Sequence, residues 1–383
     1  MVQEADKKTL KLVSSDSHVN EVEATWERVQ KQYGDRAPRV VWNPAEGEEG
    51  PYLVVGGASG SLDGTDRESC AMEFFGMVTG GLALDPNDSR ASEKAREFRK
   101  NFRFEDWRGA WDPQARLKDM DHDGVEAEII YASHLRHFYD ISAHDEPFFR
   151  AIAQSYNEWL VDFCSYAPKR LNGLPVLSVL NPQGAVEDFE EYAKRGVKGF
   201  MIGSSVPFGM SYGDKMFDPL WAAAEEAGLP LHLHISTAKW KRPNEGIRAT
   251  QIEIMHSLCE MIYGGVFDRF PKLKIVSAEF AIGWVGFWLE QLRDFPGRHH
   301  LELAPHEYLD RNIWFTFQDD RAGVLQTPMF GSDRFLWAND FPHRDCTWPD
   351  SRAIVDRQFE GISEETKRKI VRENAIGLYE LDL

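Results

Sequence analysis

The amino-acid sequence predicts a (β/α)8 barrel, and three observations favour this fold. Eight short apolar or β-branched runs recur along the 383 residues, separated by segments with helical periodicity. Most runs are continuous rather than alternating, which is typical of parallel strands covered on both faces. The first run leads into DSHVNE instead of a Gly-rich phosphate turn, which disfavours the alternative of a doubly wound open sheet. The expected strands are Leu12–His18, Val125–Ser133, Gly173–Leu180, Val197–Ser204, Leu229–Ser236, Leu273–Glu279, Asn312–Gln318 and Phe335–Asp340.

Helical segments fit between these strands, and their ends carry the usual signals. In AGLP and KRGVKG a glycine follows the last helical turn, and Ser363 with the two glutamates after it marks a helix start. The expected helices are Pro113–His122, Pro147–Tyr166, Gly184–Lys194, Pro219–Ala227, Gln251–Phe270, Trp284–Arg293 and Ser363–Tyr379.

One long segment interrupts the alternation of strands and helices. Residues 20–112 separate the first two strands and are rich in Gly, Asp and Glu. Loops of this length in compact domains are usually functional or partly disordered. We expect a single domain over residues 1–383, with 20–112 as an insertion that forms a lid or an oligomer contact. A plain surface excursion is the alternative.

Composition narrows the classes of partner and the cellular compartment. Asp and Glu number 62 against 44 Lys and Arg, a net charge of −18, which repels phosphate backbones and anionic lipid. We therefore expect a small-molecule substrate, no nucleic acid and no membrane. The cysteines form no CxxC pair, and neither a signal-peptide core nor a run of ~20 apolar residues is present. These features predict a cytoplasmic protein.

Polar residues stand where the expected strands end, which is where barrels carry their chemistry. Asp16 and His18 end the first strand, His234 ends the fifth and Asp340 ends the eighth. Residues two apart on a strand face the same way, so Asp16 and His18 point together. Taken alone, these two residues suit a turn aspartate and a core histidine. Their convergence with residues from two other strands instead predicts one divalent metal with open positions for water and substrate.

Further polar residues near the same ends are weaker candidates. Glu279 ends the sixth strand, and the apolar FAIGW after it indicates a buried approach to the site. His232 lies one layer deeper than His234 and is expected to be a hydrogen-bonded core histidine. His343 could hold Asp340 or substrate, with a hydrogen bond at a helix start as the alternative. Aromatic residues near the mouth are mostly expected in the core, although a few could wall an apolar pocket: Trp240, Phe280, Trp284, Phe317, Phe341 and Trp348.

The chain resembles the amidohydrolase-related family, in the branch that includes aminocarboxymuconate-semialdehyde decarboxylase and γ-resorcylate decarboxylase. The resemblance covers nearly the whole chain. The motifs that carry it are DSHVNE with Trp26 and DRAPRV, RLKDMDHDGVEAEIIY, AGLPLHLH, GGVFDRFPKLKIVSAEFAIGWV, WANDFPH and RENAIGLY. It implies a distorted (β/α)8 TIM barrel with one metal at the mouth, zinc first and manganese or iron as alternatives. It also implies a homo-oligomer, dimer or tetramer.

The resemblance implies roles for individual residues and shows two departures. The metal-ligand positions of the family fall on Asp16, His18, His234 and Asp340, and Asp340 is also the proton carrier. Family members often carry His or Glu where this chain has Asp16. The strand-six histidine of the family, a catalytic partner, falls on Glu279, and an ionised Glu would repel a substrate carboxylate nearby.

Three functions follow as hypotheses. The first is hydrolysis of a small aromatic or apolar substrate by a metal-activated water, with Asp340 and Glu279 as the catalytic residues. The second is non-oxidative decarboxylation of an aromatic or unsaturated acid, with Asp340 as the proton donor; the family favours it and Glu279 argues against it. The third is a barrel that binds a ligand without catalysis. The departure at Glu279 places hydrolysis first.

Overall fold

The computed structural model shows the expected parallel strands. It describes residues 10–43, 50–56, 69–73, 97, 100–207, 209–237, 250–294, 300–343 and 346–383. The parallel strands are β1 (Leu12–Val19), β5 (Val125–Ala132), β6 (Leu171–Gly173), β7 (Phe200–Gly203), β8 (Leu231–His234), β9 (Ile275–Ala278), β10 (Ile313–Phe317) and β11 (Phe335–Trp337). They form two sheets, in the orders β1-β5-β6 and β11-β10-β9-β8-β7.

Backbone hydrogen bonds join the two sheets into one ring. On one side, Met201 N–H donates to Pro175 O at 2.9 Å and Leu177 N–H donates to Met201 O at 3.0 Å. On the other side, Asp340 N–H donates to Asp16 O at 2.9 Å and His18 N–H donates to Phe341 O at 2.6 Å. The distorted (β/α)8 barrel is confirmed.

The third strand is shorter than the sequence suggests. The run Gly173–Leu180 was expected to be a strand, but β6 ends at Gly173 and only Val176 bridges onward, to Met201. Pro175 has no N–H to give to a ladder, so a continuous strand cannot pass through it.

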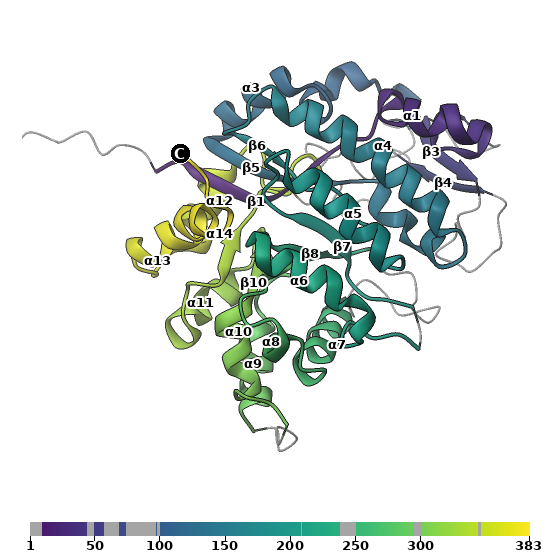
Figure 1. Cartoon of the computed structure of the whole chain (residues 1–383). Coiled ribbons are helices and arrows are strands. Elements are labelled where there is room, and N and C mark those ends of the chain that lie inside the picture. Colours follow the sequence, from purple (N-terminus) through teal and green to yellow (C-terminus); the bar gives the residue numbers. More distant parts are fainter. Residues whose placement is uncertain are drawn as a thin grey trace, which may run out of the picture.

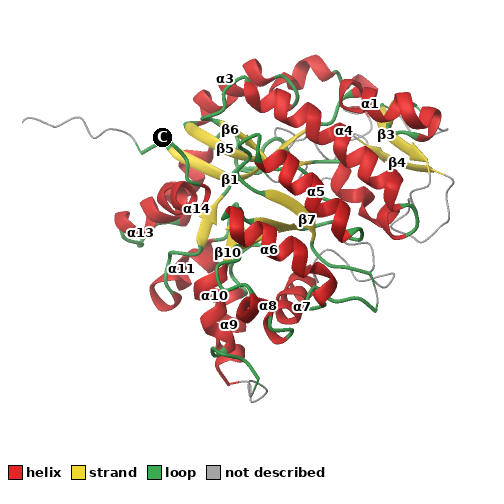
Figure 2. Cartoon of the chain, viewed as in Figure 1, coloured by secondary structure: helices red, strands yellow, loops and turns green. Residues whose placement is uncertain are grey.

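Helices cover the outside of the strands (Figures 1 and 2). They are α3 (Pro113–Asp123), α4 (Glu146–Ser165), α5 (Pro182–Ala193), α6 (Asp218–Ala227), α7 (Thr250–Tyr263), α8 (Val266–Arg269), α9 (Val285–Asp294), α10 (Pro305–Asn312), α11 (Arg321–Phe330), α12 (Ser351–Gln358), α13 (Glu364–Arg368) and α14 (Asn374–Tyr379). In Figure 1 the yellow C-terminal helix α14 lies beside the purple strand β1. Among the described residues, no helix is long and apolar enough to cross a membrane.

Two expected helices are divided. The segment Gln251–Phe270 breaks at Gly264 and Gly265, and Gly265 has a left-handed φ of 66°. A Cβ on Gly264 would lie 2.6 Å from Gly213 Cα, so the break also permits a close backbone approach. The segment Ser363–Tyr379 contains a π-helical stretch, Lys369–Glu373, between α13 and α14.

The segment between β1 and α3 contains structure that the sequence does not predict. It includes α1 (Glu23–Tyr33), an antiparallel sheet of β2 (Arg39–Trp42), β3 (Pro51–Gly56) and β4 (Ser69–Glu73), and the 3₁₀ helix Phe104–Ala110. Ser155 of α4 donates to Thr25 O in α1 at 2.7 Å, which ties this segment to the barrel. Its role as a lid or an oligomer contact stays a prediction.

Candidate metal centre

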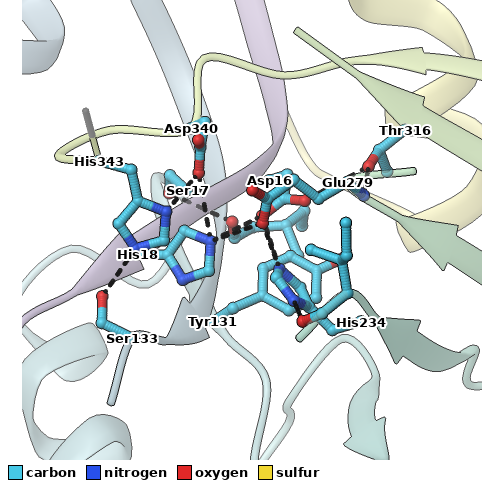
Figure 3. Close-up of polar contacts among 12 residues, drawn as sticks. Asp16, Ser17, His18, Tyr131, Ser133, His234, Glu279, Thr316, Asp340 and His343 are labelled. Atoms are coloured by element: carbon cyan, nitrogen blue, oxygen red, sulfur yellow. Dashed lines mark hydrogen bonds and ion pairs between the residues drawn. The ribbon is translucent and has the colours of Figure 1, made fainter. Parts of the chain in front are cut away.

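The strand ends bring Asp16, His18, His234, Glu279 and Asp340 together (Figure 3). His18 Nε2 lies 3.3 Å from Asp16 Oδ1 and 3.3 Å from Asp340 Oδ1. His234 Nε2 lies 3.6 Å from Asp16 Oδ1 and 3.3 Å from Glu279 Oε2. The donor atoms form two overlapping groups, one of Asp16, His18, His234 and Glu279 and one of His18, Glu279, Asp340 and His343. Asp340 therefore lies beside the group that contains Asp16 and His234, and His18 and Glu279 belong to both.

Hydrogen bonds on the far side of each imidazole fix its tautomer. His18 Nδ1 lies 3.1 Å from Ala132 O, and His234 Nδ1 lies 2.9 Å from Ile235 O. A carbonyl oxygen only accepts, so each Nδ1 carries the proton and each Nε2 of the neutral ring presents a lone pair. Both lone pairs point at carboxylate oxygens, which also only accept when ionised. Acceptors therefore face acceptors, and a cation between them resolves the conflict.

The buried donor atoms fit a metal in both number and spacing. Asp16 Oδ1, His18 Nε2 and His234 Nε2 are buried and have no hydrogen-bond partner among the described residues. Donors about 2.1 Å from a tetrahedral ion lie about 3.4 Å from one another, close to the 3.3 Å and 3.6 Å measured from Asp16 Oδ1. An imidazole and carboxylate set suits zinc, manganese or iron.

Burial shifts the pKa values of these groups in the direction that favours the neutral form of each side chain. Burial raises the pKa of Asp16 to about 8, although the charge of Arg136 opposes the shift. Burial and the neighbouring charge of Asp340 raise the pKa of Glu279 to about 7. Burial lowers the pKa of His234 to about 4 and that of His18 well below its usual value. Close, buried acids of this kind ionise together only when a cation balances them.

Glu279 is paired with an arginine that the sequence analysis did not single out. Arg136 Nη1 donates to Glu279 Oε2 at 3.1 Å, and the same oxygen lies 3.9 Å from His18 Nε2. Arg136 follows β5 within the 3₁₀ helix Leu135–Ala143. Its position just after an expected strand was the one available signal, and nothing in the pattern showed that it faces the centre.

Asp340 lies against His343, which in turn contacts Ser133. His343 Nδ1 lies 2.8 Å from Asp340 Oδ1, and His343 Nε2 lies 3.1 Å from Ser133 Oγ. The His343 ring also stacks on His18, with centroids 3.8 Å apart. Of the two roles considered for His343, the structure places it against Asp340.

Two of the acids have a left-handed backbone conformation, which sets the direction of their side chains. Glu279 has φ 66° and Asp340 has φ 56°, values that residues other than glycine rarely adopt. Glu279 N–H donates to Thr316 Oγ1 at 2.8 Å, and Thr316 Oγ1 donates to Asp16 Oδ2 at 3.3 Å. Thr316 therefore connects the ends of three strands.

A buried ion pair supports the strand that carries Asp16 and His18. Arg116 Nε donates to Glu128 Oε2 at 2.6 Å, and both residues are almost fully buried. Arg116 also donates to His18 O at 2.9 Å, Gly109 O at 3.0 Å and Ser17 Oγ at 3.1 Å. This pair fixes the backbone of β1 where the two candidate ligands project.

The remaining nominated residues belong to neither donor group, and one lies outside the described residues. His232 is buried and its Nδ1 lies 2.6 Å from Tyr131 Oη, as expected of a core histidine. Phe280, Phe317 and Phe341 are buried, whereas Trp284 and Trp348 are partly exposed. Trp240 lies outside the described residues.

The fold agrees with what comparison with known proteins finds. The chain belongs to the amidohydrolase family, whose model matches residues 20–381, beginning just after Asp16 and His18. The 2-amino-3-carboxymuconate-6-semialdehyde decarboxylase of Dictyostelium discoideum is 24% identical over 289 residues, 71% of this chain and 77% of that protein.

Solved structures show the same fold at low identity. The crystal structure of an amidohydrolase from Mycobacterium avium subsp. paratuberculosis has a TM-score of 0.78 and 24% identity, covering 97% of this chain and 98% of that chain. A mutant of 5-carboxyvanillate decarboxylase from Novosphingobium aromaticivorans, with bound manganese and 3-methoxy-4-hydroxy-5-nitrobenzoic acid, has a TM-score of 0.64 and 18% identity. It covers 98% of this chain and 99% of that chain.

Proposed function

We propose that this protein is a metal-dependent, non-oxidative decarboxylase of a small aromatic or unsaturated carboxylic acid. The observation that carries the proposal is the position of Asp340, a buried acid. Its Oδ1 lies 3.3 Å from His18 Nε2 and 2.8 Å from His343 Nδ1. A proton donor is thereby held at the edge of the donor cluster. The similarity to a semialdehyde decarboxylase and to the fold of a carboxyvanillate decarboxylase supports it.

Asp16, His18, His234 and Asp340 are the proposed ligands of one divalent ion. The ion would act as a Lewis acid that holds the substrate carboxylate and a neighbouring oxygen. Manganese is supported by the related structure that contains it, and zinc and iron suit the same donors. We further propose that the enzyme is a cytoplasmic homo-oligomer.

Asp340 supplies the proton in the reaction. As a carboxylic acid it protonates the ring carbon that bears the carboxylate. The carbon–carbon bond then breaks, its electron pair returns to the ring and CO₂ leaves. Solvent restores the proton on Asp340. The close contact with His343, 2.8 Å from Nδ1 to Asp340 Oδ1, keeps the Asp340 carboxyl group beside the donor cluster.

Hydrolysis, which the sequence alone placed first, is the second candidate. The pKa of Glu279, raised to about 7 by burial and by Asp340, suits a general base near neutral pH. Glu279 would take a proton from water, and Asp340 would deliver one to the leaving group.

Turnover in labelled water separates the two reactions. The metal-loaded enzyme is incubated with 5-carboxyvanillate, 2,6-dihydroxybenzoate and 2,3-dihydroxybenzoate in D₂O, and in H₂¹⁸O in parallel. Decarboxylation gives CO₂ and a product with one deuterium on the ring carbon and no ¹⁸O on the organic product. An ¹⁸O-labelled organic product with no CO₂ would refute decarboxylation and support hydrolysis. The matched control is Asp340→Asn, which should retain metal and lose turnover.

A further inference from the structure

We propose that Arg136 is the residue that selects an anionic substrate, because its charge balances Glu279 at the open side of the metal centre. This inference rests on the proposed function, since it names the substrate group that the site accepts. It concerns binding, so it can be tested without turnover.

Arg136 lies directly against the metal centre. Its Nη1 donates to Glu279 Oε2 at 3.1 Å, and its Nε donates to His137 Nε2 at 3.4 Å. The side chain is 6% exposed, so solvent screens this charge weakly.

Arg136 gives the loaded centre a net positive charge. Asp16 and Glu279 are two carboxylates, the proposed ion is divalent, and Asp340 is the proton donor in its neutral acid form. Without the guanidinium this centre would be neutral, with the Glu279 carboxylate facing an incoming anion. With the guanidinium the centre carries one positive charge, and the repulsion expected from Glu279 is offset. The objection that Glu279 raises against a carboxylate substrate therefore loses its force.

Glu279 marks the accessible side of the cluster. Its side chain is 20% exposed, whereas the side chains of Asp16, His18 and His234 have no exposure. A substrate that reaches the deeper donors therefore passes Glu279, with the Arg136 guanidinium directly beside it. A planar guanidinium can bind one carboxylate while donating to a second anion, a geometry that lysine does not reproduce.

A buried anchor holds Arg136 in place. Glu21 accepts hydrogen bonds from the backbone N–H groups of His134, at 2.9 Å and 3.0 Å, and of Leu135, at 3.1 Å. The His134 ring adds a contact of 2.7 Å from Nδ1 to Glu21 Oε2. The residues immediately before Arg136 are thereby fixed, which preorganises its side chain.

A double-mutant cycle that removes each charge in turn tests the inference. Arg136→Gln, Glu279→Gln and the double variant are loaded with Mn²⁺, and metal content is checked by mass spectrometry. Titration calorimetry then measures binding of 2,6-dihydroxybenzoate and of neutral resorcinol. We expect Arg136→Gln to weaken benzoate binding at least tenfold while resorcinol binding stays within twofold. We expect Glu279→Gln to strengthen benzoate binding, and the double variant to recover most of the loss.

The controls separate charge from folding. Arg150→Gln removes an arginine from an ion pair with Asp188 at 2.8 Å, outside the centre, and should bind both probes like the wild type. Arg136→Lys keeps the charge and should retain more benzoate affinity than Arg136→Gln, even if the latter folds poorly. Equal losses for both probes, a double variant as weak as Arg136→Gln, or no benzoate binding by the wild type would overturn the inference. Charge-dependent benzoate binding without CO₂ release would refute decarboxylation as the reaction and would still support Arg136 as the residue that selects the anion.

Discussion

Replacing Arg116 with Met should destabilise the fold strongly, because it leaves Glu128 buried without its cation. Removing one partner of a buried pair costs about 3–5 kcal/mol. Unfolding entropy of roughly 2.1 cal/mol/K per residue, over 383 residues, gives about 0.8 kcal/mol/K. The melting temperature should therefore fall by about 4–6 °C. The variant also loses the hydrogen bond to His18 O, so its metal affinity should fall too.

Urea unfolding in excess chelator measures the stability change without the contribution of bound metal. The double variant Arg116→Met/Glu128→Leu removes both charges and should recover at least half of the lost free energy. Arg293→Met is the control, because the side chains of Arg293 and its partner Glu290 are 45% and 54% exposed and such pairs contribute about 0–1 kcal/mol. A loss below about 1 kcal/mol in Arg116→Met, or a double variant no more stable than the single one, would refute the reasoning.

Three other predictions follow from the same structure. Burial raises the pKa of Asp123 from 3.8 to about 6, so the folded state binds more protons than the unfolded state between these values and stability falls as pH rises through them. Asp123→Asn should therefore gain up to about 3 kcal/mol on the wild type between pH 4 and pH 7, measured by urea unfolding, and a constant difference would contradict this. Saturating Mn²⁺ at about 1,000 times its Kd should stabilise the wild type by about 4 kcal/mol in thermal unfolding, and His234→Ala should lose most of this gain; equal gains would argue against His234 as a ligand. Asp340→Asn should reduce kcat by about 10²–10⁴-fold with metal bound, and rapid turnover by this variant would remove Asp340 as the proton donor.

Much of the fold could be predicted because its strands are rich in apolar residues and alternate with helical segments along the chain. Pro175 interrupts the third strand, a local effect that the apolar run masked. The glycine pair Gly264–Gly265 is visible in the sequence, but the apolar periodicity on both sides of it predicts one continuous helix, so the break does not follow from the pattern. The antiparallel strands of the insertion were missed because their short runs lie among Gly-rich and acidic residues that signal loops.

The candidate site also contains residues that the sequence predicts and one that it does not. Asp16, His18, His234 and Asp340 could be brought together from sequence because the carboxyl ends of barrel strands converge. Arg136 could not, because it lies in a 3₁₀ helix beyond its strand, where no periodicity fixes the direction of a side chain. Glu279 was placed at the site, but its consequence depends on the arginine beside it.

The way this centre is built links its stability to its chemistry. Asp340 and Glu279 sit in left-handed backbone, which costs about 1–3 kcal/mol at each residue, and their carboxylates gather with Asp16 around two imidazole lone pairs. The hydrogen bond from Thr316 to Asp16 and the contact of His343 with Asp340 hold this unfavourable arrangement but add little positive charge. The proposed cation and the Arg136 guanidinium supply the positive charge that offsets these carboxylates. In our proposal the same positive charge also attracts the substrate anion, which makes Glu279 compatible with the proposed decarboxylation.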